Sequence, residues 1–97
     1  EGRTLRPAIA CADVRRFAGA RVAIRGWLAA SRSTSAADGR TMKFLTLEDS
    51  SGLAEVVVFP DIYTRDAAQL AAGGVLRVVG VVDERYGSCT LQAERIE

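Results

Sequence analysis

The sequence predicts a small all-β domain in which five short strands close into a barrel, with one helix between the third and fourth strands. Three observations predict this class. Apolar and polar residues alternate in several short stretches, as they do in half-buried strands. Turn signals rich in glycine, serine and aspartate separate these stretches. A single stretch after the third strand instead repeats its apolar residues at helical spacing.

Length and composition limit the protein to one modest core. The 97 residues fit a single domain, and an apolar content of 48% is typical of a globular chain. No apolar run approaches the roughly 18 residues that span a bilayer, and the N-terminus lacks a secretion-signal pattern. We therefore expect no membrane partner and a cytoplasmic location. Because the chain begins with Glu1 and not with Met, we expect a piece of a longer protein.

The first part of the chain divides into a linker and the start of the barrel. We expect residues 1–20 to form an N-terminal linker with one short helical turn, and residues 21–97 to form the barrel. The first strand covers residues 21–30, with Val22, Ile24, Leu28 and Ala30 on one face, expected to be inward, and Arg25 and Trp27 on the other. The glycine between Arg25 and Trp27 leaves the orientation of Trp27 open. Gly26 predicts a bulge or bend in this strand. The serine-rich residues 31–41 predict a loop.

The remaining elements follow in the order two strands, one helix, two strands. The expected ranges are 42–48 and 53–59 for a hairpin, 60–72 for the helix, and 75–84 and 88–96 for the last strands. Pro60 suits the first position of the helix, and the glycines after residue 72 end it. Because no helix follows each strand, a doubly wound parallel sheet is excluded. Five strands with a helix after the third are typical of the OB fold, a Greek-key barrel.

Three stretches carry a resemblance to a known family. They are VAIRGWL, MKFLTLEDSSGLAEVVVFPDIY and GGVLRVVGVVDERYGSCTLQAERI, which together run from Val22 to Ile96. This part of the chain resembles the OB domain of the bacterial DNA polymerase III alpha subunit and its error-prone relatives. The resemblance implies a noncatalytic module that binds single-stranded DNA, the template strand, beside other polymerase domains or replication subunits. DNA polymerisation then belongs elsewhere in the parent chain.

A weaker resemblance links the chain to the anticodon-binding OB domains of class II aminoacyl-tRNA synthetases. Gly26–Trp27, Phe44 and the spacing L-x-D-x-x-G, which ends at Gly52, carry it. In those domains the matching phenylalanine stacks on an anticodon base. Glu55 stands where they favour glutamine, and the Phe–Pro ending of the third strand favours the polymerase resemblance.

Single-strand binding uses cations for phosphates and flat rings for bases, placed on one barrel face and its two flanking loops. The candidate nucleic-acid contacts at these places are Arg25, Trp27, Arg32, Arg40, Lys43, Phe44, Arg85 and Tyr86. We expect Arg32, Arg40 and Arg85 to meet at one mouth of the barrel. Each residue also has a structural interpretation: Phe44 beneath the linker, Trp27 in the core, and the arginines and Tyr86 simply solvated.

Enzymatic chemistry has little support in the sequence. There is no histidine, no paired acidic motif, no context for an activated nucleophile and no glycine-rich phosphate loop. Cys11 and Cys89 are too far apart for a zinc pair, and the alternation around Cys89 predicts a small buried residue. Asp49 is expected to cap the following turn. We therefore expect no catalytic residue, metal, cofactor or small-molecule substrate.

The charge balance keeps a second interpretation open. Thirteen basic and twelve acidic residues give a net charge of +1, less basic than is usual for a polyanion-binding domain. Because a barrel fold alone does not fix a function, a protein-interaction or spacer module within the polymerase is the alternative. Salt dependence discriminates between the two, since phosphate neutralisation predicts binding that falls steeply as salt rises.

Overall fold

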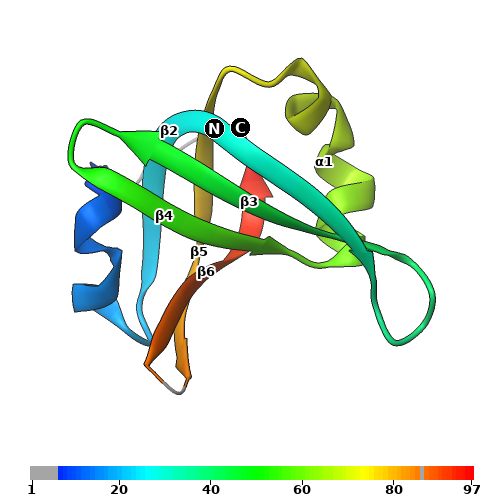
Figure 1. The fold of residues 1–97 in the computed structure, drawn as a ribbon, viewed down its shortest axis with the longest axis horizontal. Coiled ribbons are helices and arrows are strands. Elements are labelled where there is room, and N and C mark those ends of the chain that lie inside the picture. Colours follow the sequence, from blue (N-terminus) through cyan, green and yellow to red (C-terminus); the bar gives the residue numbers. More distant parts are fainter. Residues whose placement is uncertain (1–6, 86) are drawn as a thin grey trace, which may run out of the picture.

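The protein is described by a computed structural model that covers residues 7–85 and 87–97. Its elements are β1 (Ala8–Ile9), the 3-10 helix η1 (Cys11–Phe17), β2 (Arg21–Ser35), β3 (Thr41–Asp49), β4 (Gly52–Val58), α1 (Pro60–Ala72), β5 (Val75–Arg85) and β6 (Ser88–Ile96). The strands follow the order β1-β2-β3-β4-β6-β5, and pairing of β2 with β5 closes the barrel (Figure 1). The predicted OB fold is confirmed.

The helix occupies the predicted range and covers one end of the barrel. It follows β4, which is the third strand of the barrel. When the two-residue strand β1 before the barrel is counted as well, the helix lies between the fourth and fifth strands. Pro60 starts α1, and Gly73, with φ 66°, ends it by donating its N–H to the Leu70 carbonyl at 3.1 Å. Figure 1 shows α1 and η1 on opposite sides of the barrel.

The expected loop at residues 31–41 is wrong, because β2 continues as a strand to Ser35. Ser31 pairs with Leu45 and Ser35 with Thr41, so this polar segment has its backbone groups satisfied by β3. The remaining connection, residues 36–40, is closed by the Ala36 N–H, which donates to the Arg40 carbonyl at 2.8 Å. The serine content of residues 31–35 is typical of a loop, but their pairing with β3 makes them a strand.

The irregularity in β2 lies just beyond the glycine that predicted it. Residues 21–27 pair with β5 and residues 27–35 with β3, with a register shift between Leu28 and Ala30. The shift turns Ala30 outward, so its expected inward position is wrong. Gly26 has a different role: a Cβ there would lie 2.7 Å from the Glu48 carbonyl oxygen. Glycine therefore permits close approach of β2 to β3.

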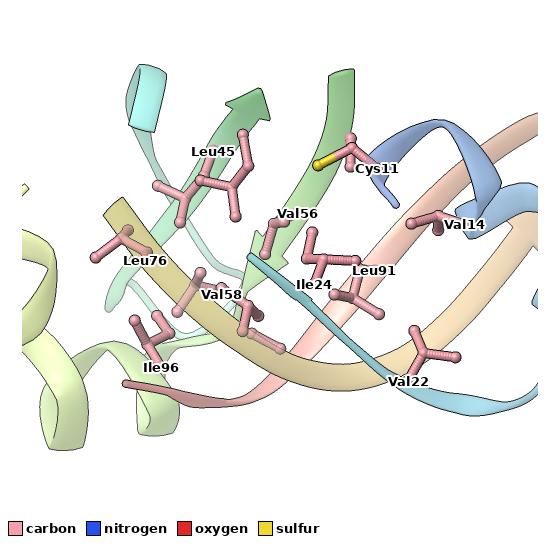
Figure 2. Close-up of a cluster of buried hydrophobic side chains, with 14 of the residues drawn as sticks. Cys11, Val14, Val22, Ile24, Leu45, Val56, Val58, Leu76, Leu91 and Ile96 are labelled. Carbon is pink, nitrogen blue, oxygen red and sulfur yellow. The ribbon is translucent and has the colours of Figure 1, made fainter. Parts of the chain in front are cut away.

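The core fills the barrel with aliphatic side chains from every long strand. Ile24, Leu45, Val56, Leu91 and Ile96 are almost completely buried. Figure 2 shows them pointing toward one another. Leu47 also faces inward, as predicted from the alternation in β3. Such burial contributes roughly 1.5–3 kcal/mol per large aliphatic side chain, so this cluster dominates the stability of the domain.

The segment before the barrel packs against it. Ala8 and Ile9 pair in parallel with Ala23 and Ile24. Two side chains of η1, Cys11 and Val14, enter the core from the end opposite α1 (Figure 2). Burial raises the pKa of the Cys11 thiol to about 11, so Cys11 serves as a neutral apolar group. The 3-10 helix η1 thus covers one end of the barrel, where it contacts β2, β4 and β6.

Candidate nucleic-acid interface

The outer face of β2, β3 and β4 presents Phe44 next to Arg32. Because Leu45 and Leu47 face inward, Phe44 faces outward, as predicted. Phe44 pairs across the sheet with Arg32 on one side and Val57 on the other. The Arg32 guanidinium carbon lies 4.4 Å from the centroid of the Phe44 ring, a cation–π contact. A flat ring and a planar cation therefore share one place on the face.

A shallow hollow lies beside this pair. It has a volume of about 130 Å³, and its lining residues are Ala30, Ser31, Arg32, Phe44, Thr46 and Glu55. The Thr46 hydroxyl donates to the Glu55 carboxylate, with oxygen–oxygen distances of 3.0 and 3.2 Å. The hollow thus combines a stacking surface, a cation and a hydrogen-bond acceptor, the groups that contact bases and phosphates in single-strand binding.

Thr46 was not among the candidate residues, although the sequence contains the signal that places it. The tight turn pairs Asp49 with Gly52, and counting back along the hairpin pairs Thr46 with Glu55 and Phe44 with Val57. Since side chains alternate along a strand, Thr46 and Phe44 share one face. Turn geometry and alternation together were sufficient to find this part of the site.

The loop arginine Arg40 is held by two carboxylates. Its guanidinium contacts Asp38 at 2.7 Å and Asp61, at the start of α1, at 2.6 Å. The Arg40 backbone N–H also donates to Asp38, and this bond, followed by the side-chain bond, lowers the pKa of that carboxyl. Arg40 therefore ties the loop to α1, and neighbouring acids offset its charge.

The expected meeting of Arg32, Arg40 and Arg85 is not seen. Arg85 contacts Asp83 at 3.1 Å, at the end of β5. Figure 1 shows the 36–40 loop on the α1 side and the end of β5 at a separate place in the molecule. The extra length of β2 explains the difference, because it carries the loop outward until Arg40 reaches Asp61.

The other described candidates lie in two different places. Lys43 is on the opposite side of β3 from Phe44, toward α1, with its Nζ 5.8 Å from the Tyr63 ring centroid. Arg25 and Trp27 are exposed on β2, beside a second cavity. Tyr86 lies outside the described residues. The structure thus brings together Arg32 with Phe44, and separately Arg25 with Trp27.

Asp49 organises the turn between β3 and β4, as predicted. It accepts hydrogen bonds from the Ser51 N–H at 2.8 Å, the Ser51 hydroxyl at 2.5 Å and the Gly52 N–H at 3.2 Å. It also accepts the Cys11 N–H at 2.9 Å, a link to η1 that the sequence did not reveal. The Ser51 hydroxyl bond and the Cys11 bond lower the pKa of Asp49 to about 2.

Residues 7–85 and 87–97 contain neither a candidate metal site nor a helix that could span a membrane. No three histidine, cysteine, aspartate or glutamate side chains gather there in a way that could hold a metal ion. Within the same residues, no helix is both long and apolar enough to cross a membrane.

The strand order and the position of the helix are those of the OB fold. Residues 22–97 match the family model described as the OB-fold nucleic acid binding domain, and the chain belongs to this family. The matched residues include the Arg32–Phe44 pair and the hollow beside it.

Two curated relatives are error-prone DNA polymerases. The chain is 36% identical over 77 residues to the protein from Ruegeria pomeroyi, which covers 79% of this chain and 7% of that one. It is 32% identical over 76 residues to the protein from Bdellovibrio bacteriovorus, covering 78% of this chain and 7% of that one. The chain thus spans about 7% of the length of these relatives. The resemblance to this polymerase family is confirmed.

A solved structure of a synthetase has a similar fold. Asparaginyl-tRNA synthetase from Pyrococcus horikoshii superposes with a TM-score of 0.72 at 20% identity, over 96% of this chain and 23% of that one. At this identity the likeness concerns the fold alone. It is in line with the weaker resemblance to synthetase OB domains.

Proposed function

We propose that this chain binds single-stranded DNA as a noncatalytic module of a DNA polymerase III alpha-type subunit. The Arg32–Phe44 pair carries the proposal, because the half-buried Phe44 ring and the exposed Arg32 cation lie together on the outer face of the barrel. Stacking on an aromatic ring is sequence-tolerant, since every base has a π-face. The partner that fits best is therefore an unpaired strand of any sequence.

The polymerase context supports the choice of DNA. The relatives over most of this chain are error-prone DNA polymerases, and template strand ahead of the site of synthesis is single-stranded. In this proposal the module holds that strand in the cytoplasm, next to other polymerase domains or replication subunits. Polymerisation belongs to the rest of the parent chain.

The charge distribution predicts weak binding. Arg40 and Arg85 both contact carboxylates, and Glu55 adds a negative charge to the hollow beside Phe44. Among the candidate contacts that the structure describes, Arg25, Arg32 and Lys43 remain to neutralise phosphates. We expect a dissociation constant on the order of 10–100 μM, near the range of nonspecific contacts.

A protein-interaction module is the second candidate function. Its support is the near-neutral charge together with the exposed apolar side chains Trp27 and Leu53, which are 62% and 56% exposed. Large exposed apolar side chains can belong to a protein contact when they gather into a patch. An anticodon-like interaction is a third possibility, and comparison of RNA with DNA tests it.

The test is fluorescence anisotropy with labelled single-stranded DNA, duplex DNA and single-stranded RNA at two salt concentrations. We expect single-stranded DNA to bind more tightly than duplex, and its affinity to fall as salt rises. Tighter binding of RNA than DNA would favour the anticodon-like alternative. No binding at low salt with millimolar protein would reject nucleic-acid binding and favour the protein-interaction module.

A further inference from the structure

A second aromatic surface lies at the other end of the same barrel face. Trp27 is 62% exposed on β2, and its partner on the neighbouring strand β5 is Val75, which is 38% exposed. On its other side Trp27 pairs with Glu48 of β3. The ring is thus flanked by one apolar and one acidic side chain on neighbouring strands.

These residues line a hollow that is larger than the one beside Phe44. The cavity has a volume of about 300 Å³, and its lining residues are Arg25, Gly26, Trp27, Glu48, Asp49, Ser50 and Val75. This volume is at the lower end of the range for small-ligand pockets. An aromatic ring and an aliphatic side chain on its rim are the groups between which proteins hold an unstacked base.

The charged groups at the rim complement a nucleotide. Within residues 7–85 and 87–97, the side chains of Arg25 and Glu48 make no ion pair or hydrogen bond. Arg25 follows the same outward alternation as Trp27, two residues away on β2. If a base lies against Trp27, the phosphate of that nucleotide needs a cation and the amino group of the base needs a hydrogen-bond acceptor such as a carboxylate. Arg25 and Glu48 supply one of each.

The spacing of the two aromatic sites suits one continuous strand. Phe44 and Glu48 lie on the same side of β3, four residues apart, and Trp27 is opposite Glu48. Four residues of strand span about 14 Å, which is about four steps of stacked nucleotides. OB folds bind as few as about four nucleotides, so both rings fall within one small site.

We propose that the Trp27 cavity holds a second nucleobase, and that a single strand runs along β3 between Phe44 and Trp27. This inference rests on the proposed function and deepens it by giving the path and minimum length of the strand. The base stacks on Trp27 against Val75, Arg25 contacts phosphate, and Glu48 accepts from base amino groups.

The test uses the fact that Trp27 is the single tryptophan of the chain. Tryptophan emission is recorded while deoxyoligonucleotides of two and six nucleotides are added, and anisotropy of the labelled six-mer is followed in parallel. We expect the six-mer to quench Trp27 emission, with the midpoint of quenching at the same concentration as the midpoint of the anisotropy curve. The two-mer should quench only at much higher concentration. Trp27→Ala should weaken six-mer binding at least about 5-fold, the lower limit for loss of one stacked base.

Leu53→Ala is the matched control. Leu53 is 56% exposed and pairs with Glu48 on the side of β3 away from Trp27, but it does not line the cavity. It should leave binding unchanged. One outcome would overturn the second site while the proposed function stands: the six-mer binds by anisotropy, Trp27 emission does not change, and Trp27→Ala binds as tightly as wild type. Equal losses from Leu53→Ala and Trp27→Ala would also overturn it, since they would indicate a diffuse apolar contact. Absence of binding by both signals would reject the proposed function itself.

Discussion

Arg32 lies over the ring of Phe44, its cross-strand partner, with 4.4 Å between the guanidinium carbon and the ring centroid. The pair forms because a register match between β2 and β3 puts both side chains on the outer face. A guanidinium group stacks on aromatic rings and binds phosphate. The contact therefore holds the arginine in place before any ligand arrives, which reduces the entropy lost on binding.

Phe44→Ala should weaken single-stranded DNA binding by about 1–3 kcal/mol, the cost of losing one stacking platform. The fold should persist, because Phe44 is half-buried on the outer face and absent from the core. Anisotropy gives the affinity and thermal unfolding the stability. Met42→Ala is the control, since Met42 is also half-buried on this side of β3. A variant that melts several degrees lower yet binds normally would show that Phe44 is a packing residue.

The salt dependence of binding should separate Arg32 from the loop arginines. Each phosphate contact contributes about 0.7 to the slope of log affinity against log salt for single strands. Arg32→Ala should therefore flatten the slope by about 0.7. The double change Arg40→Ala and Arg85→Ala should alter it less than two full phosphate contacts would, because Asp38, Asp61 and Asp83 already pair with these arginines.

Arg95 provides the control for this series, since it lies on β6 near Glu97. Arg95→Ala should leave the slope unchanged. If Arg95→Ala and Arg32→Ala flatten it equally, the charges of the domain act diffusely and no localised phosphate contact exists at Arg32.

The N-terminal segment should contribute to the stability of the barrel. Val14 is 5% exposed in η1, and Val14→Ala removes two buried methyl groups. The expected loss is about 2 kcal/mol, from the transfer of these groups and the cavity that remains. Urea unfolding measures it. Phe17→Ala, at a position 39% exposed in the same helix, should cost much less. Equal stability of wild type and Val14→Ala would mean that the segment is a detachable linker.

The sequence predicted the inward-facing residues better than the limits of the segments. Leu45 and Leu47 alternate with Phe44, and this period of two placed the core and the outer face correctly. Residues 31–35 were predicted as a loop because their composition is that of a loop. They form a strand because their backbone groups are hydrogen-bonded to β3. Composition reports local preference, and it does not include a partner strand ten residues away.

The candidate site was predicted in part for a similar reason. Hairpin register is local, so Phe44 could be placed from the turn at Asp49. The contacts of Arg40 with Asp61 and of Asp49 with Cys11 join residues 21 and 38 positions apart. Such contacts depend on how the ends of the barrel are covered, and no short-range pattern in the sequence encodes that arrangement.

Stability should fall at acidic pH through Asp49. Its pKa in the folded protein is about 2, against an ordinary value of 3.8. A carboxyl with a lowered folded-state pKa stabilises the fold above its unfolded pKa, and this contribution is lost as pH falls from about 4 to 2. Asp49→Ala should therefore cost about 1–2 kcal/mol at pH 7, the range for a lost capping residue. The difference from wild type should shrink toward pH 2.

Urea unfolding of both proteins at pH 7 and near pH 2.5 tests this expectation. Glu48→Ala is the matched control, because the neighbouring Glu48 is exposed and its side chain has no partner among the described residues. A stability difference between wild type and Asp49→Ala that is the same at both pH values would show that the carboxylate charge at Asp49 does not matter.

Glu55→Gln should strengthen single-stranded DNA binding. The Glu55 carboxylate lines the hollow beside Phe44 and Arg32, where a phosphate close by would meet a like charge. Glutamine keeps an oxygen that can accept from the Thr46 hydroxyl and removes the charge. An exposed charge contributes up to about 1 kcal/mol, so the dissociation constant should fall by about 2- to 5-fold at low salt and less at high salt. Glu84→Gln, at an exposed position on β5, makes the same change in net charge away from the hollow and should have little effect. Weaker binding by Glu55→Gln would contradict the expectation and show that the carboxylate itself accepts hydrogen bonds from a base.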